Sequence, residues 1–433
     1  MLIAWEDSPA EPEGADDWNT PAIPIRYNGV VFPSRILPPI LPFPDQFRMP
    51  TPRHPDLSFA HCPDRRHTGA EKWDRWPDRD VIPVWVADMD FQAPAEVLEA
   101  IHARVDHGVF GYTADPPGFA PALARHLEAL HGWRIDPATV VGTPGVVTGL
   151  ALSARLLTDA GDEILTFAPV YPPFLSLPGA AERRSVRVGL VRDSSAPSGW
   201  SIDHDALQAA VTPRTKLLWL CHPHNPTGTV FSRADLLALA DFATRNSIRV
   251  ISDEIWADLI LDDIPHVPFA TLDHPAAASC ITLVAPSKTW NLAGLGCAAA
   301  IIPDAGERKR WRPSGGGLVP MVNPLGYAAA EAAWLHGDPW RRRLVALLAD
   351  HRDRTLAAVA GIPGLEATRP QATYLVWIDC RKTGNADPFA ACVAAGVGPS
   401  DGRDFGAAGF IRLNTACPTD RLEMALQRLR RAF

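Results

Sequence analysis

The stretch that decides the fold is Cys280-Ile281-Thr282-Leu283-Val284-Ala285-Pro286-Ser287-Lys288-Thr289-Trp290-Asn291. Its first half is a short apolar run, which predicts a buried strand. Lys288 then follows in a polar loop that also contains Gly294. A lysine held at the end of a rigid strand can present its amine to a small carbonyl compound, so the segment is suited to a Schiff base. The alternative for any single lysine is a solvated surface charge.

Two upstream strands also end in polar side chains. Leu217-Leu218-Trp219-Leu220-Cys221 is an apolar run that breaks into a turn at Asn225-Pro226. Arg249-Val250-Ile251-Ser252 is a second strand-like run, and Asp253 follows it. In open parallel α/β sheets, ligands collect outside the carboxyl ends of the strands. We therefore expect Asn225, Asp253 and Lys288 to line one crevice.

The order Asn-Pro-x-Gly at residues 225–228, Asp253 after a strand, and then Ser287-Lys288 resembles the aspartate-aminotransferase-like superfamily of pyridoxal-phosphate enzymes, fold type I, class I and II. The resemblance implies that Lys288 carries the cofactor and that Asp253 keeps its pyridine nitrogen protonated by ion pairing. It also implies that Asn225 donates a hydrogen bond to the phenolic oxygen. Without the resemblance, Asp253 is a solvated acid at a strand end and Asn225 is an ordinary turn residue.

Further motifs narrow the resemblance to one branch. Residues 72–74, 84–91, 107–113 and 143–147 are similar to the bacterial carbon–sulfur β-lyases, the cystathionine β-lyase family of the maltose-regulon modulator type. The similarity runs from about Phe59 to the C-terminus, in order and without large insertions. It implies cleavage of L-cystathionine, or of another L-cysteine S-conjugate, to a thiol, pyruvate and ammonia.

A phosphate site is expected where Thr143-Pro144-Gly145 leads into a helical run from Val146. The free N–H groups and the positive dipole end of a helix make a cradle for a phosphate. The alternative is a tight connection without a ligand. The resemblance implies four phosphate ligands and one residue that stacks on the cofactor ring: the amides of Val146 and Val147, the hydroxyl of Ser287, Tyr112 from a neighbouring subunit, and the ring of Tyr171.

Arg412 is the single cation of the apolar run Phe410-Ile411-Arg412-Leu413. A guanidinium forms two parallel hydrogen bonds with a carboxylate, and the resemblance assigns this position to the substrate carboxylate. The alternative is a strand-edge arginine with a solvated head. Two positions depart from the superfamily: Gly296 stands where many members have a phosphate-binding arginine, and Trp256 stands where transaminases often have tyrosine. An indole donates a hydrogen bond but cannot act as a phenol does, so we expect the phenolic oxygen of the cofactor to be held differently.

Composition sets broader limits on function. The 433 residues are 47% hydrophobic and 21% charged, as in a globular enzyme of two or three domains. A net charge of −8 argues against nucleic acid or an anionic membrane as the main partner. No run approaches the roughly 18–20 apolar residues of a membrane span, and the first residues lack a secretory signal. The seven cysteines form no CxxC pair, which predicts reduced thiols and a cytoplasmic location. His222 and His224 have no further ligand at metal-site spacing, so we expect no metal.

The chain is predicted to be α/β and to have four parts. Residues 1–55 form a Pro-rich arm, extended or disordered, with Met49 close to where family members begin. Residues 56–112 join the small domain. Residues 113–322 form the large cofactor-binding domain, with a mainly parallel seven-stranded sheet covered by helices, and residues 323–433 form a smaller α+β domain. The resemblance implies a homodimer with shared active sites.

The expected mechanism uses Lys288 to remove the Cα proton of the amino acid, after which a thiolate leaves from Cβ. An aminotransferase needs the same side chains and remains the alternative. A specialised secondary-metabolic enzyme that acts on an S-cysteinyl conjugate, or one that runs decarboxylative deamination, is also open. A regulatory protein partner is a further alternative, and the first segment of the chain is the place where it would bind.

Overall fold

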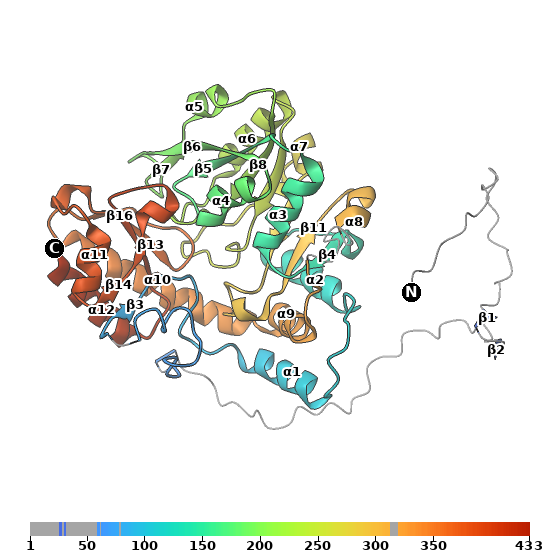
Figure 1. Cartoon of the computed structure of the whole chain (residues 1–433), viewed down its shortest axis with the longest axis horizontal. Coiled ribbons are helices and arrows are strands. Elements are labelled where there is room, and N and C mark those ends of the chain that lie inside the picture. The colour runs from blue at the N-terminus through green and yellow to red at the C-terminus, as the bar shows by residue number, and fades with distance from the viewer. Residues whose placement is uncertain (1–25, 28–29, 32–58, 61, 78, 312–318) are drawn as a thin grey trace. The chain divides into compact units, whose positions relative to one another are not determined.

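The polar strand ends predicted from the sequence belong to one large sheet (Figure 1). The computed structural model describes residues 26–27, 30–31, 59–60, 62–77, 79–311 and 319–433. The strand order is β4-β11-β10-β9-β8-β5-β6-β7. The strands are β4 (Val140–Thr143), β5 (Glu163–Ala168), β6 (Arg184–Arg192), β7 (Trp200–Ile202), β8 (Thr215–Cys221), β9 (Arg249–Asp253), β10 (Ile281–Val284) and β11 (Ala298–Ile301).

Five neighbouring strands of this sheet, β10, β9, β8, β5 and β6, are parallel. β11 runs antiparallel to both β10 and β4, and β7 pairs antiparallel with β6 at the far edge. The mainly parallel sheet is therefore as predicted, with one correction to the strand number. The eighth strand is β7, a run of three residues too short to give a periodic signal in the sequence.

The large sheet is buried on both faces at β8, where successive side chains enter different cores. Leu217 and Trp219 pack in a cluster with Leu150 of α3 (Val146–Leu157). Leu218 and Leu220 pack in another cluster with the apolar face of α6 (Arg233–Arg245). This two-sided burial produces the continuous apolar runs by which the strands were recognised. Other helices that connect or flank these strands are α2 (Phe119–His131), α4 (Pro172–Ala180), α5 (His204–Ala209), α7 (Pro275–Ala278) and α8 (Ala305–Trp311).

A second, antiparallel sheet is formed near the C-terminus in the order β12-β13-β16-β15. Its strands are β12 (Glu366–Ala367), β13 (Leu375–Asp379), β15 (Ser400–Asp401) and β16 (Phe410–Asn414). The helices of this half are α9 (Pro324–His336), α10 (Asp338–Ala360), α11 (Pro388–Ala394) and α12 (Thr419–Ala432). Arg412 lies at the centre of β16, where it is paired with Trp377 of β13.

Residues ahead of the large sheet contact this C-terminal half. β3 (Ile82–Pro83) pairs in parallel with β14 (Val397–Gly398), and the amide of Asn414 donates to the carbonyl of Val84. The next element, α1 (Ala95–Asp106), packs against α9. The division of the chain at residues 112 and 322 stays a prediction.

The first 51 residues form a separate unit. Within it the structure describes an antiparallel pair, β1 (Arg26–Tyr27) with β2 (Val30–Val31). The rest of the predicted arm over residues 1–55 lies outside the described residues. Among the helices that the structure describes, none is both long and apolar enough to cross a bilayer.

Candidate active site

Lys288 emerges from the end of β10, a strand whose residues are all buried. Its Nζ donates to the carbonyl oxygen of Ala87 at 2.7 Å. The ring of Trp256 lies on another side, with its centroid 5.8 Å from Nζ. Burial of the amine, together with the positive charge of Arg412, lowers the pKa of Lys288 to about 8, while the negative charges of Asp88 and Asp253 act in the opposite direction. An appreciable fraction of this amine is therefore neutral near physiological pH.

Asp253 is the last residue of β9, between β8 and β10. Its Oδ1 accepts a hydrogen bond from the amide of Ile255 at 3.1 Å. No lysine or arginine nitrogen of the described chain lies within ion-pair distance of this carboxylate, and only 4% of the residue is exposed. Burial raises the pKa of Asp253 to about 7, despite the attraction of Lys288. A buried carboxylate in this condition is suited to pair with a cation that the protein itself does not supply.

Arg412 and Asn225 are in direct contact, although they are far apart in the sequence. Arg412 Nη1 donates to Asn225 Oδ1 at 2.8 Å, and both residues are buried. Because its oxygen is occupied, the Asn225 amide presents its Nδ2 donors to the remaining space, and within the described residues Nδ2 makes no hydrogen bond. The shared crevice of Asn225, Asp253 and Lys288 stays a prediction, and the contact brings Arg412 to the first of these residues.

The Arg412 guanidinium is held in place and yet incompletely paired. Nη2 donates to the carbonyl of Trp85 at 2.8 Å and to Ser400 Oγ at 3.1 Å, and the guanidinium lies 4.5 Å from the ring centroid of Phe405. Nε is buried without a hydrogen-bond partner, and no carboxylate of the described chain forms an ion pair with the side chain. Burial lowers the pKa of Arg412 to about 10. A buried cation without a counter-ion favours an anionic ligand.

Tyr171 lies beside this pair. Its backbone amide donates to the carbonyl of Asn225 at 3.1 Å, and the residue precedes the first turn of α4. Burial raises the pKa of the Tyr171 hydroxyl, and the charges of Arg412 and Asp253 also act on it. Tyr171 thus contacts Asn225, which was also expected at the cofactor ring.

The residues predicted to cradle a phosphate lie at the first turn of α3. Val146 and Val147 are its first two residues, and the residue before them, Gly145, provides no side-chain cap. Their amides are among those that have no partner within a helix. Ser287 is half-buried in the loop that leads to Lys288.

The loop after Lys288 touches the loop before α3 at Gly296. Gly296 has φ of +55°, and a Cβ added there would lie 3.3 Å from the Pro144 carbonyl oxygen. The left-handed backbone and this close approach both disfavour a side chain. This explains why glycine, rather than the arginine of many superfamily members, occupies the position.

Tyr112 does not join the other predicted site residues. It lies in the connection between α1 and α2, and its side chain is fully exposed, at 102% of the reference area. Val109 and Phe110 in the same connection are also exposed. Within its own chain Tyr112 has no role that the geometry reveals.

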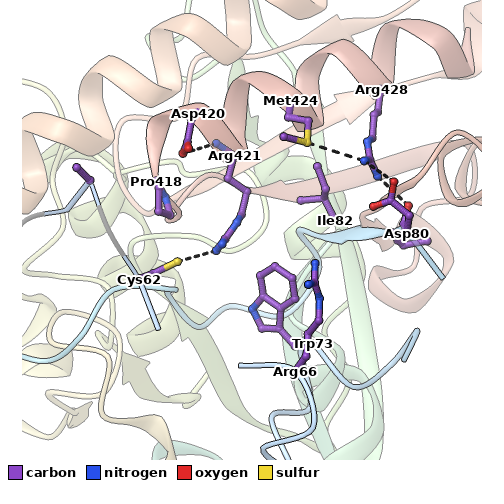
Figure 2. A pocket seen from close by; sticks show the side chains of 12 residues that line it. Cys62, Arg66, Trp73, Asp80, Ile82, Pro418, Asp420, Arg421, Met424 and Arg428 are labelled. Atoms are coloured by element: carbon purple, nitrogen blue, oxygen red, sulfur yellow. Dashed lines mark hydrogen bonds and ion pairs between the residues drawn. The ribbon is translucent and has the colours of Figure 1, made fainter. Parts of the chain in front are cut away.

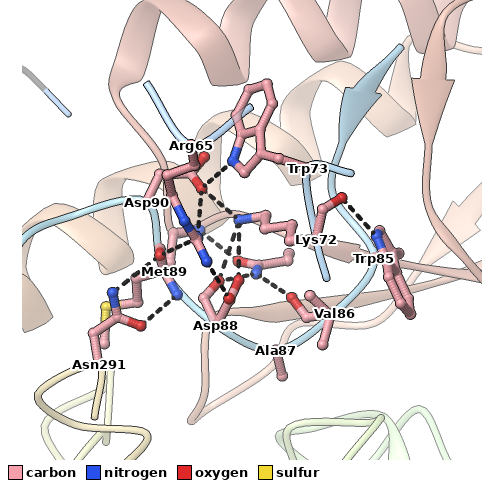
Figure 3. Close-up of polar contacts among 12 residues, drawn as sticks. Arg65, Lys72, Trp73, Trp85, Val86, Ala87, Asp88, Met89, Asp90 and Asn291 are labelled. Atoms are coloured by element: carbon pink, nitrogen blue, oxygen red, sulfur yellow. Dashed lines mark hydrogen bonds and ion pairs between the residues drawn. The ribbon is translucent and has the colours of Figure 1, made fainter. Parts of the chain in front are cut away.

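Residues 85–91, here called the strap, had no role predicted from the sequence, and one of them, Ala87, accepts the hydrogen bond of Lys288. Figure 3 shows the polar contacts of this segment. Polar side chains bind its backbone. Asn414 Nδ2 donates to the carbonyls of Val86 and Asp88 at 2.7 and 2.6 Å. Asn291, three residues after Lys288, accepts from the amide of Met89 at 2.9 Å. Asn291 and Asn414 are the sequence features that could have indicated these contacts, since an Asn side chain can both donate to a backbone carbonyl and accept from a backbone amide.

An ion-pair cluster holds the outer side of the strap (Figure 3). Arg65 Nη2 lies 2.7 Å from Asp88 Oδ2, and the fully buried Lys72 Nζ lies 3.1 Å from Asp90 Oδ1. Burial by itself would raise the pKa of Asp90, but Lys72, the indole of Trp73 and other donors hold it below its ordinary value. The motif at residues 72–74 thus packs on the motif at residues 84–91.

A second buried network, also not predicted, lies behind Asp253. Glu254 accepts from Ser252 Oγ and from the amide of Phe269, and its Oε2 is 2.8 Å from His266 Nε2. Asp258 binds His126 Nε2 and His131 Nε2, each at 3.0 Å. These groups position the segment 253–258. Glu254 and Asp258, close to Asp253 in the sequence, are the signal from which this network could have been predicted.

His222 and His224 are buried close to the strand end of β8. His222 Nε2 lies 3.2 Å from the carbonyl of Val267, and His224 Nδ1 lies 2.9 Å from Thr227 Oγ1. Burial lowers the pKa of each histidine to about 3, so both are neutral. Among the described residues, no group of three histidine, cysteine or acidic side chains is arranged to hold a metal ion.

A surface cavity of about 360 Å³ lies elsewhere, between residues 60–82 and α12 (Figure 2). Its lining includes Cys62, Arg66, Trp73, Arg421 and Arg428. None of the predicted site residues lines it. The site around Lys288 is therefore defined by its contacts and chemistry rather than by this cavity.

Comparison with known proteins places this geometry in a family. Residues 79–429 match the family described as aminotransferase class I and II. The chain is 34% identical to cystathionine beta-lyase PatB of Bacillus subtilis (strain 168) over 393 residues, which cover 87% of this chain and 100% of that protein.

Two solved structures have the same fold over most of the chain. The OvoB structure superposes with a TM-score of 0.83 at 41% identity and covers 87% of this chain and 99% of its own. Cystalysin from Treponema denticola, whose structure contains pyridoxal 5′-phosphate, superposes with a TM-score of 0.82 at 29% identity over 87% and 98% of the two chains.

Proposed function

Since this chain belongs to the aminotransferase class I and II family, and the similar solved structure of cystalysin contains pyridoxal phosphate, we propose that it is a pyridoxal-phosphate-dependent carbon–sulfur β-lyase. Its substrate would be L-cystathionine or another L-cysteine S-conjugate, cleaved to a thiol, pyruvate and ammonia. The relative named cystathionine beta-lyase, which matches along its whole length, supports this reaction. The observation that carries the proposal is the half-buried Lys288 amine, held near the buried and incompletely paired Arg412.

The residues present fit pyridoxal phosphate. Asp253 is a buried carboxylate that forms no ion pair with a described lysine or arginine, which suits a protonated pyridine nitrogen. Asn225 Nδ2 is available to donate to the phenolic oxygen. The amides of Val146 and Val147 and the Ser287 hydroxyl would hold the phosphate, and Tyr171 would stack on the ring. When bound, the cofactor supplies an electron sink for the negative charge that develops at Cα.

Lys288 has two tasks that its surroundings support. Its amine would attach the cofactor and, when released from it, would take the Cα proton of the substrate. A general base works best when its pKa lies near the working pH, and burial together with Arg412 brings Lys288 to about 8. The Ala87 carbonyl at 2.7 Å keeps the released amine from swinging into solvent.

Arg412 would bind the substrate carboxylate. Its Nε donor has no partner, and the side chain has no counter-ion in the described chain, so an α-carboxylate would satisfy both. The contact between Arg412 and Asn225 supports an arrangement in which the substrate carboxylate would lie next to the residue that would hold the cofactor ring. Substrate binding and cofactor orientation therefore share one hydrogen bond.

We also propose a homodimer in the cytoplasm. A fully exposed tyrosine in an exposed apolar connection, Val109 to Tyr112, suits contact with a second copy, whose phosphate Tyr112 would reach. All seven cysteines are free, which suits a reducing compartment.

The decisive experiment supplies L-cystathionine, L-cystine and S-alkyl cysteines to the purified protein, with and without a 2-oxo acid as amino acceptor. A lyase releases thiol and pyruvate in equal amounts without the acceptor, and Lys288→Ala serves as the control without the reacting amine. Product formation that depends on the 2-oxo acid would instead identify an aminotransferase. A different S-cysteinyl conjugate as the only substrate would identify a specialised lyase.

A further inference from the structure

The carbonyl oxygen of Ala87 is shared by two donors. Lys288 Nζ donates to it at 2.7 Å, and the hydroxyl of Tyr374 donates to it at 3.0 Å. A carbonyl oxygen has two lone pairs, so both hydrogen bonds can exist at the same time. Tyr374, 86 positions after the lysine, thus lies one shared acceptor away from the reacting amine.

The Ala87 carbonyl is fixed by the strap on either side of it. Asn414 binds the carbonyls of Val86 and Asp88, and the Trp85 carbonyl accepts from both Arg412 and Ser400 Oγ at 2.8 Å. The strap therefore holds its position through side chains of β15 and β16, without help from the lysine. The position of the Ala87 carbonyl therefore does not depend on its hydrogen bond with Lys288.

Tyr374 is fixed as well. It is fully buried just ahead of β13, and its ring meets the ring of Trp256 edge to face, with centroids 4.9 Å apart and an interplanar angle of 74°. The Trp256 ring in turn lies 5.8 Å from Lys288 Nζ. The Lys288 amine thus contacts the Ala87 carbonyl and the Trp256 ring, and Tyr374 contacts both of these groups.

We propose that Tyr374 and Trp256 are positioning residues for Lys288, a role that rests on the proposed function of Lys288 as the base. The Tyr374 hydroxyl occupies one lone pair of the Ala87 carbonyl and so weakens the hold of that carbonyl on the charged amine. When Nζ is engaged elsewhere, the same hydroxyl keeps the buried carbonyl hydrogen-bonded. The Lys288 amine can then break and re-form its hydrogen bond while the Ala87 carbonyl keeps a hydrogen-bond donor. The Trp256 ring acts in the opposite sense, because the face of an indole stabilises a nearby cation.

Three charged groups also act on the Lys288 amine. Arg412 on β16 disfavours its protonated form, while Asp88 in the strap and Asp253 at the end of β9 favour it. The substitutions Tyr374→Phe and Trp256→Phe leave all three in place. Any change in the titration of the Lys288 amine is then caused by loss of the Tyr374 hydroxyl or of the Trp256 indole.

The test uses the full chain after removal of the cofactor, so that it does not depend on turnover. Reductive methylation modifies only neutral amines, and mass spectrometry of the peptide that contains Lys288 gives its extent at each pH. The wild-type midpoint is expected near pH 8. Tyr374→Phe should favour the ammonium roughly 3- to 10-fold, the ratio that one net hydrogen bond provides, and so raise the midpoint. Trp256→Phe should lower the midpoint, since a phenyl face binds a cation more weakly than an indole.

Tyr327→Phe is the matched control, because its buried hydroxyl binds Asp115 and not Ala87. It should leave the Lys288 midpoint unchanged. An unchanged or lowered midpoint in Tyr374→Phe overturns the proposal for Tyr374, and an unchanged or raised midpoint in Trp256→Phe overturns it for Trp256. If circular dichroism shows that Tyr374→Phe does not fold, the sign of the Trp256→Phe shift decides alone.

A parallel assay separates this inference from the proposed function. An active wild-type lyase whose Lys288 titration does not respond to either variant contradicts the positioning role only. A wild-type chain without lyase activity, but with the two opposite shifts, contradicts the proposed reaction only. In the active holoenzyme, the acidic limb of the pH profile of kcat, which reports the substrate complex in which the amine is free, should move in the same direction as the labelling midpoint.

Discussion

Replacing Asp253 by asparagine should slow catalysis while stabilising the cofactor-free protein. Asp253 is buried, and its Oδ1 accepts one hydrogen bond, from the amide of Ile255 at 3.1 Å. The asparagine side chain has nearly the same shape, and its oxygen can keep that bond. The variant should therefore fold normally, and its effects should come from the missing charge alone.

The gain in stability follows from the raised pKa of Asp253. Burial shifts it from 3.8 to about 7. The folded protein then binds more protons than the unfolded chain between these values, so stability falls as pH rises through this window, and the loss is complete above about pH 7. A shift of about three pH units corresponds to about 4 kcal/mol, which we take as an upper bound for the destabilisation that Asp253→Asn removes.

The assay is denaturant unfolding of cofactor-free wild type and Asp253→Asn at about pH 5 and about pH 8. The gain in unfolding free energy from Asp253→Asn should be larger at the higher pH. About two of the three pH units between the unfolded and folded pKa values of Asp253 lie between pH 5 and pH 7. In the loaded enzyme the variant should lose about 10²–10⁴-fold in turnover, the range for a lost ionic or proton-handling partner. An equal advantage at both pH values, or a less stable variant at pH 8, would refute the electrostatic argument. Near-normal turnover would show that another residue pairs with the ring nitrogen.

Four further outcomes are expected. Lys288→Ala should lose the covalent, borohydride-reducible attachment of the cofactor, and a retained adduct would reject Lys288 as its anchor. Arg412→Lys should lower kcat/KM about 10²-fold, mainly through KM, since a lysine cannot reproduce the forked contact; unchanged kinetics would place the substrate carboxylate elsewhere. Sedimentation should find a dimer, and Tyr112→Ala should weaken phosphate binding; a monomer that is fully active at nanomolar concentration would argue against shared sites. Deletion of residues 1–48, to start at Met49, should cost little stability or activity, and loss of dimerisation would identify the arm as structural.

The parts of the site that could be predicted from the sequence share a local signal. Asn225, Asp253 and Lys288 each follow an apolar run, and the sheet buries those runs on both faces, so the run and the polar residue after it are read together. The parallel order of β8, β9 and β10 then brings the three strand ends together. The local pattern identifies the three strand ends, and the general rule that ligands bind at the carboxyl ends of parallel strands groups them at one edge of the sheet.

The remaining contacts could not be predicted, for physical reasons. The hydrogen bond from Lys288 to Ala87 joins residues 201 positions apart and uses a backbone carbonyl, which every residue has. The role of Tyr374 depends on that same carbonyl. The partner of Asn225 is Arg412, 187 positions away, on the other sheet. Such contacts arise only when both sheets have formed.

The identity of the reaction is tested most directly by its products from one substrate. L-cystathionine should be converted by the wild-type protein to equal amounts of pyruvate and thiol without any 2-oxo acid, and Lys288→Ala should form neither. Absence of pyruvate together with transfer of the amino group to an added 2-oxo acid would contradict the lyase assignment.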